Sequence, residues 1–479
     1  MICGSTKPLL LRQETLLLGF VVVFGLAASF ALWPGHGIAD DAYITYRYAW
    51  NISNGYGFVY NIGERVQGTS TPLYTVILAA AGIFGFDIPL ASWVINVLAL
   101  VATVVITFLF LRRIHSQEAA YIAAILSSIA LQPVAAMGME TPVYILLISG
   151  AFYALAKERY LLATVLGSGC ALTRLDGLAV GVAVLGSIML FQKKIPWKQI
   201  ALYIFLIAPW FVFASIYFDG GILPASFLAK RAHTGYEFFS LWMIGVVVSS
   251  PYSAYAFVGL IRLFNNRLRY AILPIFSWSV LYVVAYSLSS IGPGYSWYQF
   301  PIKWALICFA SIGACTLVHV IRNLIEGARL PTGSKFLASI VFIVLLAFPQ
   351  VRELISWHTS VINPASIDSV RWRAASWLGQ NLYKPRSIGM RGIGFVGWML
   401  PDTYVVDLLG LVTPKIVVDC GLEVSWVECG LEKYKPDYVF DAWPPNASIG
   451  NNYKKLKSWS IGAAGNYTGW DFTLFKRIN

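Results

Sequence analysis

Long apolar runs recur along the first three quarters of the chain, for example at residues 16–33, 90–111 and 302–321. A helix needs about 20 apolar residues to cross the roughly 30 Å of hydrocarbon in a bilayer. The pattern predicts an all-α polytopic membrane protein with about eleven transmembrane helices within residues 1–350. The first run lacks a small-residue cleavage site, so we interpret it as a transmembrane helix and not as a signal peptide.

Basic residues are concentrated in alternate loops between these runs. One set of loops carries Lys7, Arg12, Arg112, Arg113, Lys157, Arg159, Lys193, Lys194, Lys198, Arg262, Arg267, Arg269, Arg322, Arg329 and Lys335. Cytoplasmic loops of membrane proteins are rich in Lys and Arg. We therefore expect this set and the N-terminus to be cytoplasmic, in a multi-pass protein of the plasma membrane, and the other loops to face outward.

The apolar segment 72–86 is only 15 residues long. If it crossed the membrane, Arg112 and Arg113 would lie outside, against the pattern of positive charges. We therefore expect a helix that lies in or dips into the outer interface. The first outer loop then extends over residues 34–89.

From residue 351 onward the pattern changes, because 14 of the 35 basic and 11 of the 23 acidic residues lie there. Apolar spacing predicts a helix at residues 370–382 and strands at 404–406, 416–418, 438–440 and 472–475. Residues 351–479 are thus predicted to form a soluble α/β domain, extracytoplasmic because an odd number of helices precedes it. Cys420 and Cys429 lie in this domain; an oxidising compartment would allow a disulfide, but their spacing leaves the pairing open.

The composition supports the membrane assignment. With 58% hydrophobic and only 12% charged residues, the chain falls outside the range of ordinary soluble domains. Its net charge of +12 would suit nucleic acid, but the basic residues gather at the predicted cytoplasmic surface. The expected partners are therefore membrane lipids, and no nucleic acid.

Unusual polar residues concentrate at the outer side of the predicted bundle, at Asp40, Asp41, Glu140, Arg174, Asp176 and Lys230. Ionisable groups near membrane depth are costly and usually face a functional cavity. The plain alternative is that loop ends hold charged residues in any membrane protein. The cluster nevertheless predicts a functional site on the outer side.

The adjacent carboxylates Asp40 and Asp41 suit a general base or a metal site. A second interpretation is that one of them is the N-cap of a helix suggested by residues 43–51, and the two roles are compatible. Among the outer-loop histidines His36 and His233, and His358 in the soluble domain, no set of residues with zinc spacing stands out. A divalent cation (Mg, Mn or Ca) held by Asp40, Asp41 or Glu140 remains open.

Several motifs carry a family resemblance. Residues 39–74 read ADDAYITYRYAWNISNGYGFVYNIGERVQGTSTPLY, followed in order by METP, LTRLDG, LPASFLAK, WYQFP, VVDLLGLVTP and KPDYVF. The chain closely resembles the GT-C membrane glycosyltransferases related to the mycobacterial terminal arabinofuranosyltransferase, over nearly its whole length. Leu175 departs from the family pattern, in which proline is frequent at this position.

The resemblance implies a GT-C glycosyltransferase, transferring a hexose or pentose. It would move a sugar, with a pentofuranose such as arabinose as a candidate, from a polyprenyl-phosphate donor to a hydroxyl of a cell-envelope glycan or glycolipid on the extracytoplasmic face. Asp40 and Asp41 would be catalytic, with Asp40 the favoured base. Donor binding would involve Lys230 and Arg174, with Tyr43 and Arg47 shaping the loop around the phosphate. Further candidates are Glu64, Glu140, Asp176 and Tyr298.

Two other functions compete with this interpretation. A transporter or flippase of lipid-linked saccharides would also need many transmembrane helices, and should show inverted repeats or matching Gly and Pro breaks, neither of which stands out. A glycan-binding protein would need only the outer domain.

The charge pattern yields a testable topology. A reporter fused after Arg113 should behave as cytoplasmic, and one fused after Asn479 as extracytoplasmic, because positive loops stay inside. Paired phosphatase and fluorescent-protein fusions measure this directly. An extracytoplasmic signal at Arg113 would mean that segment 72–86 crosses the membrane.

Overall fold

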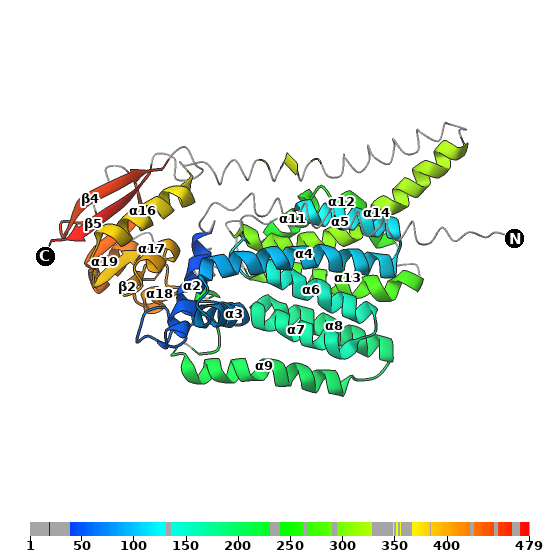
Figure 1. The fold of residues 1–479 in the computed structure, drawn as a ribbon, viewed down its shortest axis with the longest axis horizontal. Helices are drawn as coiled ribbons and strands as arrows, with labels where there is room; N and C mark the ends of the chain where they lie inside the picture. Colours follow the sequence, from blue (N-terminus) through cyan, green and yellow to red (C-terminus); the bar gives the residue numbers. More distant parts are fainter. Residues whose placement is uncertain are drawn as a thin grey trace.

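The computed structural model describes residues 39–130, 136–219, 221–227, 240–261, 266–289, 295–327, 366–383, 385–421, 426–444, 449–461 and 470–478, and the single residues Gly19, Ala229, Phe348, Val351, Arg352 and Ile355. Nearly all of the first predicted transmembrane run lies outside these residues, as does Lys230. The described part is a bundle of roughly parallel helices with a smaller α/β domain at one end (Figure 1).

Within the described residues, five helices are long and apolar enough to cross a membrane: α4 (Ile88–Ile114), α8 (Leu178–Gln192, with the preceding turn η2, Leu175–Gly177), α9 (Trp197–Tyr217), α13 (Asn266–Leu288) and α14 (Gln299–Gly327, with the preceding turn η4, Ser296–Tyr298). A sixth would be α11 (Trp242–Ser249) with α12 (Ser253–Leu260), which are bent by 87°. The chain is thus a polytopic membrane protein, and the count of about eleven remains a prediction.

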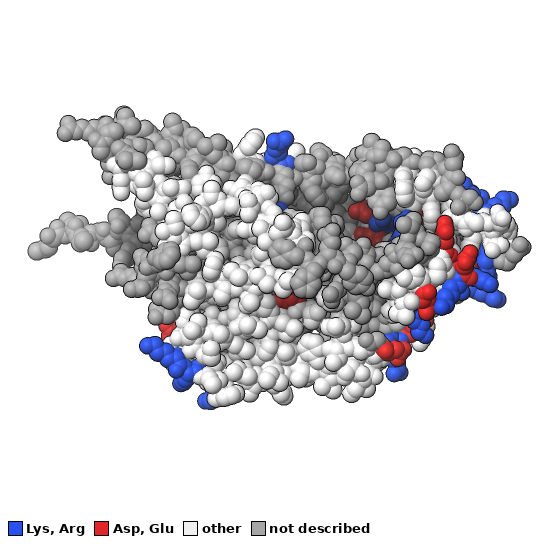
Figure 2. Space-filling model, turned by 180° about the vertical axis from the view of Figure 1, so that it is seen from behind, with Lys and Arg blue, Asp and Glu red and all other residues white. Residues whose placement is uncertain are grey.

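Shorter helices fill the bundle: α5 (Gln117–Ala130), α6 (Thr141–Ala156) and α7 (Tyr160–Thr173). The Phe152 and Trp304 rings stack in the core with centroids 6.1 Å apart, and the Trp304 indole donates to the Thr107 hydroxyl at 2.9 Å. At the edge of the bundle, α9 is mostly exposed although it is apolar, as expected of a helix that faces lipid. Charged side chains on the face shown in Figure 2 gather mainly toward the two ends of the molecule.

The segment predicted to be the first outer loop, and called so from here on, contains α2 (Asp40–Ser53) and α3 (Pro72–Ile83). At about 1.5 Å per residue, the 12 residues of α3 extend about 18 Å, which is too short to cross the hydrocarbon. This length agrees with the interfacial helix expected at residues 72–86. The N-cap of α2 is Ala39, and Asp40 and Asp41 belong to its first turn. The interpretation of either carboxylate as the N-cap of this helix is therefore wrong.

The C-terminal domain is α/β, as predicted. Its sheet has the order β2-β1-β3-β5-β4, with β1 (Ser387–Met390) parallel to β2 (Tyr404–Asp407) and β3 (Tyr438–Trp443), and β5 (Asp471–Arg477) antiparallel to β3 and β4 (Tyr453–Ser460). The helices are α16 (Ile367–Asn381), α17 (Gly394–Met399), α18 (Lys415–Cys420) and α19 (Trp426–Tyr434). The predicted helix at 370–382 and the strands at 404–406, 438–440 and 472–475 are confirmed.

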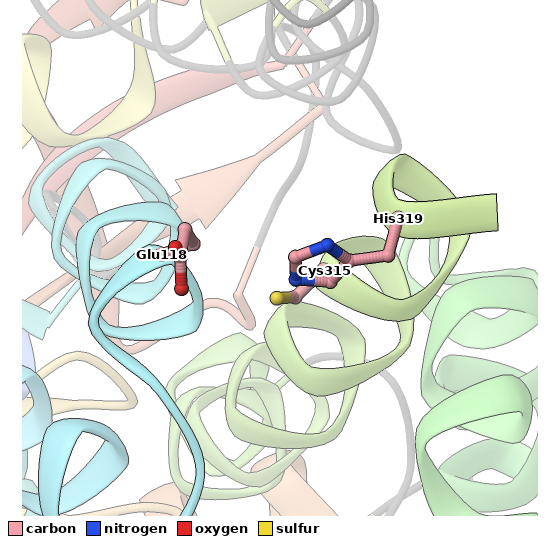
Figure 3. Close-up of side chains that lie close together, drawn as sticks. All are labelled: Glu118, Cys315 and His319. Atoms are coloured by element: carbon pink, nitrogen blue, oxygen red, sulfur yellow. The ribbon is translucent and has the colours of Figure 1, made fainter. Parts of the chain in front are cut away.

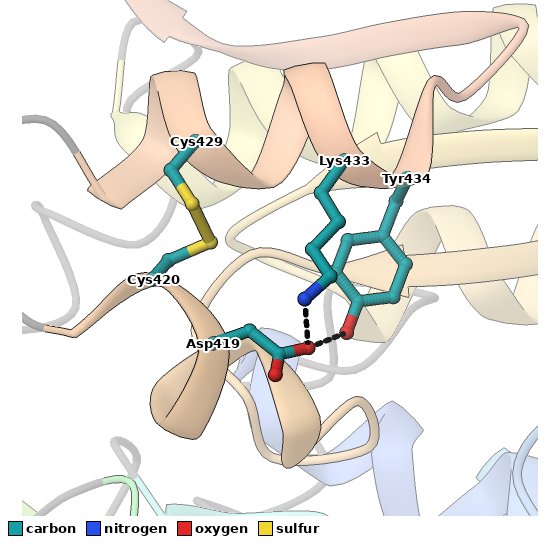
Figure 4. Close-up of a disulfide and its surroundings, with 5 residues drawn as sticks. All are labelled: Asp419, Cys420, Cys429, Lys433 and Tyr434. Atoms are coloured by element: carbon teal, nitrogen blue, oxygen red, sulfur yellow. Dashed lines mark hydrogen bonds and ion pairs between the residues drawn. A yellow bond between two sulfur atoms is a disulfide. The ribbon is translucent and has the colours of Figure 1, made fainter.

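The strand predicted at residues 416–418 is wrong, because these residues belong to helix α18. Pro414 has a helical φ of −62°, and the amides of Ile416 and Val417 donate to Thr413 and Pro414 at 3.0 and 3.2 Å, which starts a helical turn. Cys420 then forms a disulfide with Cys429 on α19, with Cα atoms 5.7 Å apart (Figure 4). The pairing that the sequence left open is therefore made.

An ion pair beside the disulfide also joins α18 to α19. The Asp419 carboxylate lies 2.8 Å from the Lys433 ammonium and accepts a hydrogen bond from the Tyr434 hydroxyl at 3.4 Å (Figure 4). All three side chains are near solvent, so the pair contributes little stability beside the covalent link.

Arg47 of α2 joins the first outer loop to the C-terminal α/β domain, which we name the outer domain after its predicted position. Its side chain is 2% exposed and donates to four backbone carbonyls, those of Tyr60 (2.9 Å), Gly397 (2.8 Å), Pro401 (3.3 Å) and Thr403 (2.8 Å). Three of these carbonyls belong to the end of α17 and the residues that lead into β2. Burial lowers the pKa of Arg47, and the carbonyl dipoles compensate for the lost hydration.

Two further residues of the loop bind the edge strand β2. The Asn61 side chain donates to the carbonyl of Val405 at 2.9 Å and accepts from its amide at 3.0 Å, as a neighbouring strand would. The Glu64 carboxylate accepts from the Tyr404 hydroxyl at 2.8 Å and from the Asn61 amide at 3.2 Å. We call these contacts and those of Arg47 the joint between loop and outer domain.

The turn that follows β2 also packs against the first outer loop. Asp407 is fully buried and accepts from the amides of Leu409 and Val412, both at 2.9 Å. Burial raises the pKa of Asp407 to about 7. A Cβ at Gly68 would lie 2.5 Å from Val412 and 2.9 Å from the carbonyl of Leu411, so only glycine permits this close contact.

The joint generates a prediction for Arg47→Lys. Lysine keeps the charge but loses the planar fork that reaches several carbonyls at once, and each hydrogen bond from a charged donor contributes about 1.5–3 kcal/mol. We expect the docked outer domain to lose about 3 kcal/mol or more, measured as a lower unfolding midpoint in detergent and faster proteolysis between the two domains. The control is Arg65→Lys in the same loop, whose side chain is exposed. Wild-type melting of Arg47→Lys would contradict the assigned role.

Candidate active site

Helix α2 presents two different faces. Asp40, Tyr43 and Arg47 follow one another at helical spacing and all contact the outer domain. Asp41 and Thr45 are four residues apart and therefore lie on another face. The Thr45 hydroxyl is 3.3 Å from that of Thr69 and 3.5 Å from that of Thr71, the residues on either side of Ser70.

Asp40 binds the N-terminus of α17. Its two carboxylate oxygens accept from the amides of Gly394 at 3.0 Å and Phe395 at 2.8 Å, and the side chain is buried. The first amides of a helix lack partners within the helix and attract negative charge. A Cβ at Gly394 would lie 1.7 Å from the Asp40 carbonyl oxygen, so the approach requires glycine. Both oxygens of Asp40 are thus engaged in holding the outer domain.

Arg371 of α16 lies beside Asp40. Its Nη1 is 4.0 Å from the Asp40 carboxylate and 3.2 Å from that of Asp368. Asp41, partly exposed, is the next residue of α2. Sequence reasoning missed Arg371, because an arginine on an exposed helix of a soluble domain carries no signal of its own.

Tyr43 is buried in aromatic contacts at the joint. Its ring lies 4.9 Å from that of Phe395, 5.6 Å from Trp372 and 5.9 Å from Trp398, measured between centroids. Such contacts add to the burial of apolar area and fix the angle at which α17 meets α2. Tyr43 and Arg47 therefore shape the loop, and neither is among the residues that line the cavity described next.

A cavity of about 280 Å³ opens between the first outer loop and the helix ends. Five of the sequence motifs converge on it, from the first loop, α6, η2, the segment before Lys230, and η4. Its lining includes Ser70, Glu140, Arg174, Leu175, Asp176, Pro224, Ser226, Phe227, Ala285, Tyr286, Ser289 and Tyr298. Of the predicted site residues, the structure thus brings Glu140, Arg174, Asp176 and Tyr298 together.

Arg174 is held at the wall of this cavity by two carboxylates. It makes a bidentate contact with Asp176, Nε to Oδ1 at 3.0 Å and Nη2 to Oδ2 at 2.8 Å, and Nη1 donates to Glu140 at 3.2 Å. Its guanidinium carbon is 5.0 Å from the ring centroid of Tyr144 and 4.5 Å from that of Tyr298. These contacts fix the guanidinium in place, and together with one to Tyr286 they use four of its five N–H donors, so an oxyanion could be bound by the remaining Nη1 donor.

Tyr286 of α13 completes the cluster. Its hydroxyl accepts from Arg174 Nη2 at 2.8 Å and donates to Asp176 at 2.7 Å. Sequence reasoning missed this residue, because tyrosine is common in transmembrane helices. Its spacing of four residues from Tyr282, whose hydroxyl donates to the Tyr298 carbonyl at 2.8 Å, is a weak signal that could have found it.

The predicted site residues thus fall into two groups. Glu140, Arg174, Asp176 and Tyr298 line the cavity, whereas Asp40, Tyr43, Arg47 and Glu64 bind the outer domain. Asp41 lies on the α2 face that leads through Thr45 to the cavity wall. Lys230 lies outside the described residues, next to the lining segment that includes Ser226 and Phe227.

Asp40 and Glu140, two of the residues predicted to hold a cation, are already bound to other groups of the protein. Both oxygens of Asp40 accept backbone amides, and Glu140 pairs with Arg174. Within the described part of the chain, the one group of three or more possible ligands lies elsewhere, at Glu118, Cys315 and His319. A cation at Asp40, Asp41 or Glu140 therefore stays a prediction, and no step below depends on it.

A family model described as a domain of unknown function (DUF8728) matches residues 364–475, within the predicted outer domain. No curated protein matches the chain by sequence.

Solved structures match nearly the whole chain. ArnT from Cupriavidus metallidurans bound to undecaprenyl phosphate aligns with a TM-score of 0.60 at 12% identity, over 96% of this chain and 97% of that chain. The oligosaccharyltransferase AglB from Archaeoglobus fulgidus, in complex with an inhibitory peptide and a dolichol-phosphate, aligns with a TM-score of 0.55 at 11% identity. This alignment covers 88% of this chain and 69% of AglB.

Arabinofuranosyltransferase AftD from Mycobacteria aligns with a TM-score of 0.53 at 13% identity. The alignment covers 96% of this chain and 40% of AftD, so the chain spans about two fifths of that protein's length. At such low identity these likenesses establish the architecture alone. The chain has the GT-C fold, which its motifs predicted.

Proposed function

We propose that this protein transfers a sugar from a polyprenyl-phosphate donor to a hydroxyl of a cell-envelope glycan or glycolipid, on the extracytoplasmic side of the plasma membrane. The observation that carries the proposal is the convergence of five motifs on one cavity with a preorganised guanidinium, Arg174. The similar structures hold undecaprenyl phosphate or dolichol-phosphate, which supports a lipid-phosphate donor. The structural likeness to an arabinofuranosyltransferase supports arabinose as the candidate sugar.

Charge balance assigns a role to Lys230. Among the described lining residues, Arg174 is balanced by the two carboxylates Glu140 and Asp176, so this cluster carries a formal charge of −1. An anionic phosphate needs a further cation there, because unbalanced charge in a site of low polarity is costly. Lys230 follows the lining residue Phe227 by three positions in sequence, and we assign it to the donor phosphate together with Arg174.

We assign different roles to the two adjacent aspartates. Asp40 holds α17 and acts as a positioning residue, because its oxygens are engaged by two amides. Asp41 is on the α2 face that leads to Ser70 in the cavity wall. We assign Asp41 as the general base that takes the proton of the attacking acceptor hydroxyl, while the polyprenyl phosphate leaves toward Arg174 and Lys230.

The assay uses the purified full-length protein with a sugar linked to polyprenyl monophosphate. We expect transfer from this donor, and none from soluble nucleotide sugars, because the site faces away from the cytoplasm. Asp41→Asn should lower the rate by about 10² to 10⁴ without changing the melting midpoint, as the loss of a general base does. Asp40→Asn should lower the melting midpoint as well, because an amide accepts only one of the two backbone hydrogen bonds.

One control variant and two outcomes separate the alternatives. Asp368→Asn, which changes the exposed carboxylate paired with Arg371 beside Asp40, should retain transfer. If Asp41→Asn keeps more than about a tenth of the wild-type rate, Asp41 is not the base. Movement of the lipid-linked sugar across vesicles without any transfer would favour a transporter instead.

A further inference from the structure

A second group of polar side chains lies at the opposite end of the bundle from the cavity. Glu118 of α5 faces Cys315 and His319 of α14 across the contact between the two helices (Figure 3). The ligand atoms of the three residues all lie within 4.8 Å of one another. Cys315 and His319 are four residues apart, which places both on one face of α14.

The three donors are a sulfur, an imidazole nitrogen and a carboxylate oxygen, the mixed set that zinc prefers. In a tetrahedral zinc site with bonds of about 2.0–2.3 Å, neighbouring ligand atoms lie about 3.3–3.8 Å apart. Separations of up to 4.8 Å therefore need to shorten by at most about 1.5 Å. Glu118 and His319 are exposed and can change rotamer, whereas Cys315 is buried and fixes the sulfur.

We propose that Glu118, Cys315 and His319 bind one divalent ion of the zinc class, which clamps the N-terminus of α5 to α14. Water would complete the fourth position, as in zinc sites with three protein ligands. The site is separate from the proposed transfer site and does not depend on it. Under the predicted topology it is cytoplasmic, where thiols stay reduced and available to a metal.

Cys308 offers a matched control for the thiol. It lies two turns before Cys315 on the same helix, is equally buried, and does not belong to the ligand group. A cysteine that serves only as a small apolar side chain should behave as Cys308 does. The difference between the two cysteines therefore isolates metal binding from packing.

The test is a Co²⁺ titration of full-length protein purified in detergent and treated with chelator. We expect about one equivalent to bind, with the thiolate-to-cobalt charge-transfer band that sulfur ligation gives. Cys315→Ser should abolish this band, and Cys308→Ser should retain it. Zn²⁺ should displace the cobalt, because it binds such N, S and O sites more tightly than Co²⁺.

Variants of the two exposed ligands test the site even if the buried Cys315→Ser variant misfolds. Glu118→Gln and His319→Gln should each weaken Co²⁺ binding by about tenfold or more, since even residues outside the coordination sphere contribute that much. Zn²⁺ should raise the melting midpoint of the wild type but not of these variants. No metal uptake by the wild type, or an unchanged charge-transfer band in Cys315→Ser, would overturn the proposal.

Discussion

The structure depends on the buried guanidinium of Arg47. A charge removed from water is costly unless other groups replace its hydration, and here four backbone carbonyls and the Tyr60 ring, 4.3 Å from the guanidinium carbon, do so. These partners come from two parts of the chain more than 300 residues apart in sequence. The first outer loop and the outer domain therefore hold each other in place.

This docking determines where the proposed chemistry occurs. One face of α2 carries Asp40, Tyr43 and Arg47 and is fixed against α17. The rotation of the helix about its axis is thereby set, and with it the direction of Asp41 and Thr45. Through Thr69 and Thr71, this second face meets the wall of the cavity that contains Arg174. The outer domain thus acts on the proposed site through α2, without contributing a residue to the described cavity lining.

The sequence was informative where a residue type is rare in its surroundings. Glu140, Arg174 and Asp176 stand out because ionisable residues near apolar runs are costly, and the structure brings them together. The resemblance favoured Asp40 as the base, whereas the proposal assigns Asp41, because the sequence alone could not show that α17 covers the Asp40 side of α2. The strand prediction at residues 416–418 failed because three apolar residues are too few to define a strand. Pro414, just before them, starts a helix instead. Tyr286 could not be predicted, because a tyrosine in an apolar helix is not unusual in sequence.

In the proposed function, the cavity at Arg174 receives the phosphate of the donor lipid. The most direct measurement is a cryo-EM structure of the full-length protein with a bound polyprenyl monophosphate. We expect phosphate density within hydrogen-bonding distance of the Arg174 guanidinium and the Lys230 ammonium, with Asp41 on the acceptor side. Lipid phosphate bound at another place, with the cavity at Arg174 occupied only by protein side chains or water, would contradict it.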